Sequence, residues 1–164
     1  MAPNPADPID RLLAELSPLY TTASQGAARF VAGPSGVFVL VSGGDDLGQA
    51  AERAARLAAV TRAALADHLS WVPFVDAVVV TAAGARNKAP SPPNDDVAAH
   101  ATAVPLDLLG EVLVEGRRVI DDAAFRTINQ LLRDEALSPW RTEPATTADK
   151  IDLCEPTADT SAKA

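Results

Sequence analysis

The stretch that decides the fold is Ala-Arg-Phe-Val-Ala (28–32), Gly-Pro-Ser-Gly (33–36) and Val-Phe-Val-Leu-Val-Ser (37–42). Both flanks are rich in β-branched and aromatic residues, which favour strands. Pro34 presets φ at the second position of a turn and Gly36 suits its fourth position, so the flanks are predicted to form a β-hairpin. Apolar side chains on both faces of the second strand indicate that it lies in the middle of a sheet.

Helical and strand patterns continue on both sides of this hairpin. Asp7 and Pro8 are typical of an N-cap and a first helical position, and they predict a helix that ends near Ser17. After the hairpin, an apolar stripe predicts a helix over about 47–68, and residues 72–80 form an almost continuously apolar strand. Strand, helix and strand make a βαβ unit, so residues 72–80 are expected to run parallel to the second hairpin strand.

The rest of the chain divides into shorter segments. Residues 84–96 have the composition of a loop. Residues 98–104 are predicted to form a short strand, and residues 106–114 are predicted to form a brief helix. An apolar stripe after Asp121 and Asp122 predicts a last helix. We therefore expect an N-terminal helix and lead-in (1–24), a single α/β domain (25–137) and a disordered, acidic tail (138–164).

Composition limits the possible functions. The 164 residues suit one domain, and their formal net charge is −8 with the basic residues dispersed, so nucleic acid is not expected as a partner. No apolar run reaches the roughly 20 residues that span a bilayer, and residues 1–10 lack the pattern of a signal peptide. We therefore expect a cytoplasmic protein without a membrane contact. The single cysteine, Cys154, excludes an intramolecular disulfide and a cysteine metal cluster.

Several motifs that carry chemistry in other proteins are incomplete here. Residues 43–48 (Gly-Gly-Asp-Asp-Leu-Gly) lack the Lys-Ser or Lys-Thr of a phosphate loop and place two carboxylates where an anion would bind. Ser35 stands in a hairpin turn, not in the strand-to-helix turn of a nucleophile elbow. His68 and His100 have no partners at the spacing of a zinc site or a general base. We therefore assign no catalytic, cofactor-binding or metal-binding residue.

Acidic residues occur in three adjacent pairs, Asp45–Asp46, Asp95–Asp96 and Asp121–Asp122. The first and last pairs suit helix starts, and the middle pair lies in the predicted loop. Asp76 differs because it interrupts a buried strand. A buried aspartate without a partner is costly, so Asp76 is expected to meet a hydrogen-bond donor or an arginine, or to lie at a sheet edge.

Residues 33–40 (Gly-Pro-Ser-Gly-Val-Phe-Val-Leu) resemble the hallmark hairpin of the nuclease-related domain family, whose fold resembles that of restriction endonucleases. Members typically read Ile-Asp-His, three apolar residues, Gly-Pro-Gly-Gly, Val-Phe-Val-Ile and then Asp-Thr-Lys. The order of the elements that follow is similar as well, across roughly residues 25–137. The resemblance implies a restriction-endonuclease-like α/β fold: a small mixed sheet with a central β-hairpin and a βαβ unit, flanked by helices.

The resemblance also implies which positions would carry nuclease chemistry. The first aspartate of the family motif falls on Ala28 and its histidine on Arg29, while the second carboxylate falls on Val41 and the lysine on Gly43. Such carboxylates would hold the magnesium ion that activates water, and neither is present. Glu15 stands near the place of a helix glutamate in the family pattern, but one ligand alone does not hold a metal. The resemblance therefore implies a non-catalytic relative.

Three functions stay open. The first is a non-catalytic nuclease-related domain that acts in protein interaction or regulation without a cofactor, with Arg29 and residues 86–88 as candidate contact points. The second is a metal-dependent, DNA-processing nuclease with relocated carboxylates, Asp45, Asp46 and Asp76. The third is a small-molecule pocket at the carboxyl ends of the parallel strands. We expect the first, with a protein as the partner; the sequence indicates no oligomeric state.

Overall fold

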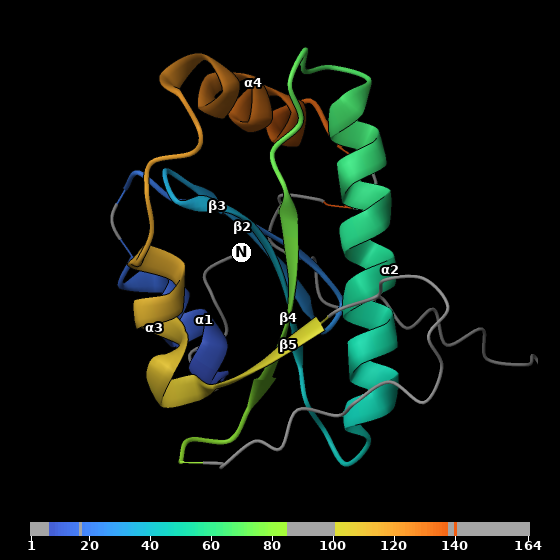
Figure 1. Ribbon diagram of the computed structural model, residues 1–164, viewed down its shortest axis with the longest axis vertical. Helices are drawn as coiled ribbons and strands as arrows, with labels where there is room; N and C mark the ends of the chain where they lie inside the picture. Colours follow the sequence, from blue (N-terminus) through green and yellow to red (C-terminus); the bar gives the residue numbers. More distant parts are fainter. Residues whose placement is uncertain (1–6, 17, 85–100, 138–139, 141–164) are drawn as a thin grey trace, which may run out of the picture.

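The computed structural model describes residues 7–16, 18–84, 101–137 and 140. These residues form a five-stranded sheet whose strand order follows the chain (Figure 1). The strands are β1 (Thr21–Gln25), β2 (Ala28–Gly33), β3 (Gly36–Ser42), β4 (Val75–Thr81) and β5 (Ala101–Pro105). The pairs β1–β2 and β2–β3 are antiparallel, whereas β3–β4 and β4–β5 are parallel, so the sheet is mixed.

The hairpin and the βαβ unit predicted from the sequence are both present. In the hairpin, Ala28 lies opposite Val41 and Gly33 lies opposite Gly36, so the turn closes at the predicted place. The chain then forms α2 (Leu47–Ala66) and returns in β4, which pairs in parallel with β3. Every residue of β3 except the last is buried, as expected of a strand with neighbours on both sides.

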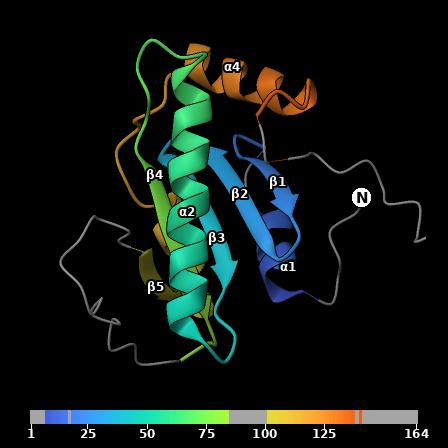
Figure 2. The same cartoon turned by 90° about the vertical axis from the view of Figure 1, so that its right-hand side faces the viewer.

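Helices cover both faces of the sheet (Figures 1 and 2). The helices α2 and α4 (Asp122–Arg133) pack on one face, and α1 (Pro8–Ala14) and α3 (Leu106–Val114) pack on the other. Alternate residues of β3 divide between two cores: Val37, Val39 and Val41 face α2 and α4, while Phe38 and Leu40 face α1 and α3. The predicted fold class, an α/β fold with a small mixed sheet flanked by helices, is confirmed.

Three of the helices begin at an aspartate whose side chain caps them. Each carboxylate accepts a backbone N–H two or three residues further on: Asp7 from Ile9 (2.9 Å), Asp46 from Gln49 (3.0 Å) and Asp121 from Ala124 (2.7 Å). Capping therefore accounts for two of the three acidic pairs, as predicted. The third pair, Asp95–Asp96, lies outside the described residues.

The edge strand β1 is not predicted by the sequence. Its five residues (Thr-Thr-Ala-Ser-Gln) include a single buried side chain, Ala23, so they lack the apolar alternation that marks a half-buried strand. The strand pairs with β2, and Ile9 and Leu13 of α1 pack in the core beneath the sheet. Residues 7–16 and 18–24 therefore pack with the same sheet as the rest of the domain, and do not form a separate lead-in.

Trp140 extends the fold past the predicted end of the domain. Composition assigns residues 138–164 to the tail, yet the Trp140 side chain is 0% exposed. Its ring centroid lies 5.6 Å from that of Phe30, and its Nε1 donates to Oγ1 of Thr61 at 2.6 Å. The domain therefore includes Trp140 instead of ending at Leu137; the other residues of the predicted tail lie outside the described ranges.

Candidate functional site

The positions that the resemblance assigns to nuclease chemistry lie where β2 and β3 pair. Ala28 and Val41 lie opposite each other and are 0% and 3% exposed, within the core that α2 and α4 cover. Gly43 has little room for a side chain, because a Cβ there would lie 2.7 Å from Leu47 Cδ2 and 3.0 Å from Val79 Cγ1. Apolar packing therefore fills these positions, and no group at them can hold a metal or move a proton.

Arg29, the residue next to Ala28, forms a largely buried ion pair between β2 and α1. Its Nε donates to Asp10 Oδ1 at 2.6 Å and its Nη2 to Asp10 Oδ2 at 3.1 Å, which is a bidentate arrangement. Asp7 Oδ2 lies 3.4 Å from Nη2, and the backbone oxygen of Gly26 accepts from Nη1 at 2.7 Å. The Arg29 and Asp10 side chains are only 14% and 11% exposed. Arg29 therefore joins α1 to the sheet, and little of it is available as a contact point.

The structure does not bring Asp45, Asp46 and Asp76 together. Asp45 and Asp46 follow the carboxyl end of β3, whereas Asp76 is the second residue of β4 and lies in register with Phe38. Phe38 lies four positions before Ser42 at the end of β3, which is about 13 Å along the strand. Asp76 also projects to the face that α1 and α3 cover. Among the described residues, no three His, Cys, Asp or Glu side chains lie close enough to share a metal.

The other residues considered from the sequence lie apart from one another. Ser35 Oγ donates to the backbone oxygen of Leu113 at 2.5 Å, so it fastens the hairpin turn to α3. His68 is exposed just after α2, and Glu15 is exposed at the end of α1. His100 and residues 86–88 lie outside the described ranges. Ser35, His68 and Glu15 therefore do not combine into one catalytic or metal-binding site.

Burial raises the pKa of Asp76 above its ordinary value of 3.8, because the half-buried carboxylate is partly desolvated. The hydrogen-bond donor or arginine that the sequence predicts for Asp76 is not found within the described part of the chain. The charged form of this carboxylate is therefore less favourable in the folded state than in the unfolded state.

Asp76→Asn is expected to raise the free energy of unfolding near neutral pH. The carboxylate titrates at its ordinary pKa in the unfolded state and at a higher pKa in the folded state. In the pH interval between these two pKa values, the folded state therefore binds more protons than the unfolded state. The free energy of unfolding of the unmodified chain therefore falls as the pH rises through the interval, and it stays lower above it. Asparagine does not titrate, so the variant should gain relative to the unmodified chain between about pH 4 and about pH 7.

Urea unfolding at the two pH values measures this gain. Asp45→Asn removes the same charge from an exposed position and serves as the control, and it should change the free energy of unfolding by less than about 0.5 kcal/mol. A loss of stability in Asp76→Asn at neutral pH would instead mean that the carboxylate has a partner in solution.

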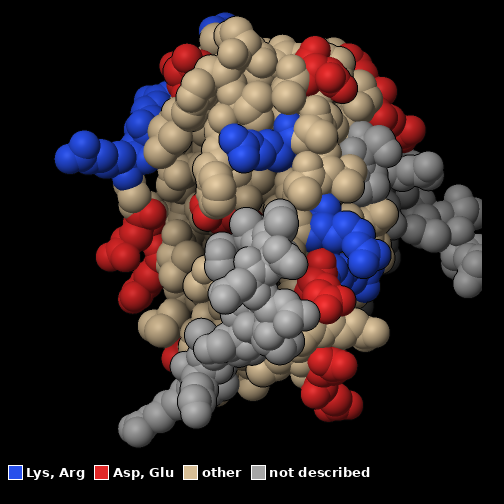
Figure 3. All heavy atoms as spheres, turned by 45° about the vertical axis from the view of Figure 1, so that its right-hand side comes forward, with Lys and Arg blue, Asp and Glu red and all other residues tan. Residues whose placement is uncertain are grey.

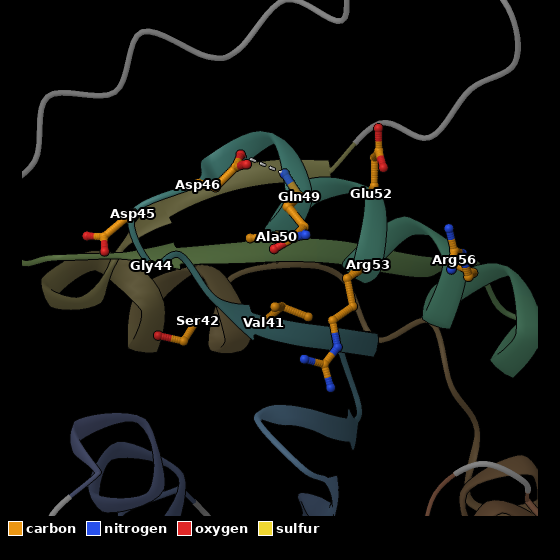
Figure 4. Close-up of a pocket in the computed structure, with 10 residues that line it drawn as sticks. All are labelled: Val41, Ser42, Gly44, Asp45, Asp46, Gln49, Ala50, Glu52, Arg53 and Arg56. Carbon is orange, nitrogen blue, oxygen red and sulfur yellow. Dashed lines mark hydrogen bonds between the residues drawn. The ribbon is translucent and has the colours of Figure 1, made fainter.

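Two clefts lie at the carboxyl ends of the parallel strands, where the sequence places a small-molecule pocket as one of three possibilities. The larger has a volume of about 720 Å³ and lies between the end of β3 and the first half of α2 (Figure 4). We call it the β3–α2 cleft; its lining includes Ser42, Asp45, Asp46, Gln49, Arg53 and Arg56. The smaller, about 510 Å³, lies between the ends of β3 and β4 and the first residues of α1 and α3.

Two aromatic side chains are exposed at the other end of α2. Trp71 and Phe74, in the connection from α2 to β4, are 55% and 64% exposed. The guanidinium of Arg62 lies over the Phe74 ring, 6.0 Å from its centroid, at the distance of a cation–π contact. We call Arg62, Trp71 and Phe74 the aromatic patch. No pattern in the sequence singles out this patch, because Trp71 and Phe74 precede an apolar strand and resemble part of it.

Charged side chains of both signs are interspersed on the surface. On the face shown in Figure 3, Lys and Arg form separate small groups with acidic side chains between them. A nucleic-acid backbone is usually bound by a continuous positive surface, so this face does not suit one. No helix within the described ranges is long and apolar enough to cross a membrane.

Comparisons with known proteins give no relative. No family model matches the chain, no curated protein matches its sequence, and no solved structure matches its fold. The functional assignment therefore depends on the chain's own residues and their geometry.

Proposed function

We propose that this chain is a non-catalytic, nuclease-related α/β domain that acts in interaction or regulation by binding a partner protein. The order of the elements supports the relationship: a central hairpin, a long helix, a buried strand, a short helix after Pro105 and a last helix. The apolar packing at Ala28 and Val41, and the lack of space at Gly43, support the loss of catalysis.

The exposed aromatic patch is the observation that carries the binding role. The other aromatic side chains of the described residues are buried or half-buried, whereas Trp71 and Phe74 are mostly exposed. Each Å² of apolar surface removed from water contributes roughly 25 cal/mol, so a partner that covered these rings would gain a large apolar contact. Tryptophan and arginine are also among the residues that dominate binding energy at protein interfaces.

The test places a photo-crosslinking residue at position 74 and, as a matched control, at position 108. Leu108 is 45% exposed on α3, on the opposite face of the sheet, so it samples an apolar surface away from the patch. We expect one partner protein to be crosslinked from position 74 in cells and none from position 108. Absence of any crosslinked protein at position 74 would overturn the binding role.

Once the partner is identified by crosslinking, the double variant Trp71→Ser with Phe74→Ser is expected to weaken its non-covalent binding by about a hundredfold, as for truncation of two interface anchors. Its free energy of unfolding should change by less than about 1 kcal/mol, because both rings are mostly exposed. Leu108→Ser with Val114→Ser removes a similar exposed pair from α3 and should leave the complex intact. Equal weakening by both double variants would contradict the assignment to the aromatic patch.

A nuclease assay tests the alternative with relocated carboxylates. Incubation of DNA with the chain and magnesium or manganese is expected to give no cleavage. Cleavage that is lost in Asp45→Asn with Asp46→Asn would overturn the proposal and support a metal-dependent nuclease.

A further inference from the structure

We propose that the β3–α2 cleft binds the carboxylate or phosphate group of a small molecule through Arg53 and Arg56. The cleft lies beside the amino-terminal half of α2, whereas the aromatic patch lies at and beyond its carboxyl-terminal end. The two proposals therefore concern different surfaces, and either can fail without the other.

Arg53 is exposed, and its side chain extends from α2 along the end of the sheet. Figure 4 shows its side chain below the helix, on the side of Val41, with Glu52 pointing the opposite way. A Cβ built on Gly26, in the β1–β2 turn, would lie 3.5 Å from Arg53 Nη2. The guanidinium therefore reaches across the end of β3 and forms one wall of the cleft.

Arg56 adds a second positive charge to the same cleft. Residues three apart on a helix are surface neighbours, so Arg56 lies one turn beyond Arg53 along α2. Within the described part of the chain, neither guanidinium forms a hydrogen bond or an ion pair. Arg29 and Arg118, by contrast, are both paired with aspartates.

The acidic residues of the cleft do not neutralise these arginines. Asp46 accepts the backbone N–H of Gln49 as the cap of α2, and Figure 4 shows Asp45 at the far end of the cleft from Arg56. Asp45 therefore lies away from the two arginines, and Glu52, which also lines the cleft, points the opposite way from Arg53. Among the described residues no group accepts a hydrogen bond from Arg53 or Arg56, so an anionic ligand in the cleft can accept from both.

The chemistry of the cleft indicates the class of ligand. The fork of a guanidinium matches the two oxygens of a carboxylate or phosphate, and two such forks in one cleft provide several charge-assisted donors. The buried residues Val41 and Ala50 form an apolar side of the cleft, which an apolar part of the same ligand can contact. A volume of about 720 Å³ lies within the range of small-molecule sites, roughly 300–1,000 Å³. The net charge of −8 disfavours a polyanion such as DNA.

The test is a titration of the full chain with inorganic phosphate and, separately, with acetate. The ionic strength is held constant with chloride, and two-dimensional amide NMR follows the backbone N–H of Gly44 and Gln49, which line the cleft. We expect saturating shifts at both amides with one of the two anions, which then identifies the ligand group. Arg53→Gln should weaken this binding by about tenfold or more, as for the loss of a charge-assisted hydrogen bond.

Arg117→Gln is the matched control, since it removes the same charge from an exposed residue outside the cleft. It is expected to weaken binding by less than about twofold. Equal weakening by Arg117→Gln and Arg53→Gln would show a general charge effect and overturn the proposal. The proposal would also be overturned if neither anion gave saturating shifts, or if a short DNA duplex gave saturating shifts and neither anion did.

Discussion

Trp140→Ala is expected to lower the free energy of unfolding by about 3–5 kcal/mol, the range found when a buried aromatic side chain is removed from a core. The indole is 0% exposed and lies beside Phe30, so its loss opens a cavity between the sheet and α2. The substitution also removes a buried hydrogen bond. Trp140 Nε1 donates to Thr61 Oγ1, which donates in turn to the backbone oxygen of Leu57 at 2.6 Å.

Urea unfolding followed by circular dichroism measures this loss. Trp140→Phe keeps a six-membered aromatic ring but removes the donor and two ring carbons, so a smaller loss of about 2 kcal/mol is expected. Trp71→Ala is the matched control, because this second tryptophan is 55% exposed and its removal should cost less than about 1 kcal/mol. A loss in Trp140→Ala no greater than that in Trp71→Ala would contradict the position of Trp140 in the core.

Two shortened chains give an independent measurement of the same contribution. A chain that ends at Leu137 lacks the indole and should lose about as much stability as Trp140→Ala. A chain that ends at Arg141 retains the indole and should be more stable than the shorter chain by about 3 kcal/mol or more. Equal stability of the two chains would mean that the domain does end at Leu137.

The hairpin and the βαβ unit could be predicted because their signals are local. Pro34 and Gly36 mark the turn, and the apolar residues from 72 to 80 mark a strand buried on both faces. β1 could not be predicted in this way, since Ala23 is its single buried residue. Its place in the sheet depends on pairing with β2, which is a tertiary interaction.

Trp140 could not be predicted from composition, because composition is an average over many residues. The segment 138–164 is rich in polar residues and proline, so its average composition predicts disorder even though it contains one tryptophan. The signal that could have found it is the tryptophan itself, since tryptophan is highly buried on average. The burial of Thr61, a polar residue within the apolar stripe of α2, is explained by the same contact.

The candidate site could be predicted in part. The βαβ unit places the carboxyl ends of β3 and β4 at one edge, and the clefts lie there. The place of the Arg53 guanidinium near the β1–β2 turn could not be predicted, because the helical pattern identifies Arg53 as an exposed residue but does not fix the direction of its side chain. The partner of Arg29 was missed as well, although Asp10 lies within the apolar stripe of its helix and is itself a signal of a buried ion pair.

Arg29→Met is expected to lower the free energy of unfolding by about 2–4 kcal/mol, toward the lower end of the range for breaking buried ion pairs. The Asp10 side chain is 11% exposed, so the variant leaves its carboxylate desolvated and without a cation. Asp7, 3.4 Å from the same guanidinium, would then face Asp10 with no positive charge between them. Most of the loss therefore comes from the charge that is left behind, and less from the attraction that is removed.

This origin of the loss is tested by removing both charges. Asp10→Leu combined with Arg29→Met leaves no buried charge at the pair, so urea unfolding should show that the double variant recovers most of the stability lost in Arg29→Met. The Arg118–Asp122 pair, 61% and 79% exposed, is the control, and Arg118→Ala should change stability by less than about 1 kcal/mol. If the double variant were as unstable as Arg29→Met, the bidentate geometry itself would be the source of the stability. Recovery would instead mean that Arg29, at the position where the resemblance places a nuclease histidine, serves to neutralise the carboxylate of Asp10.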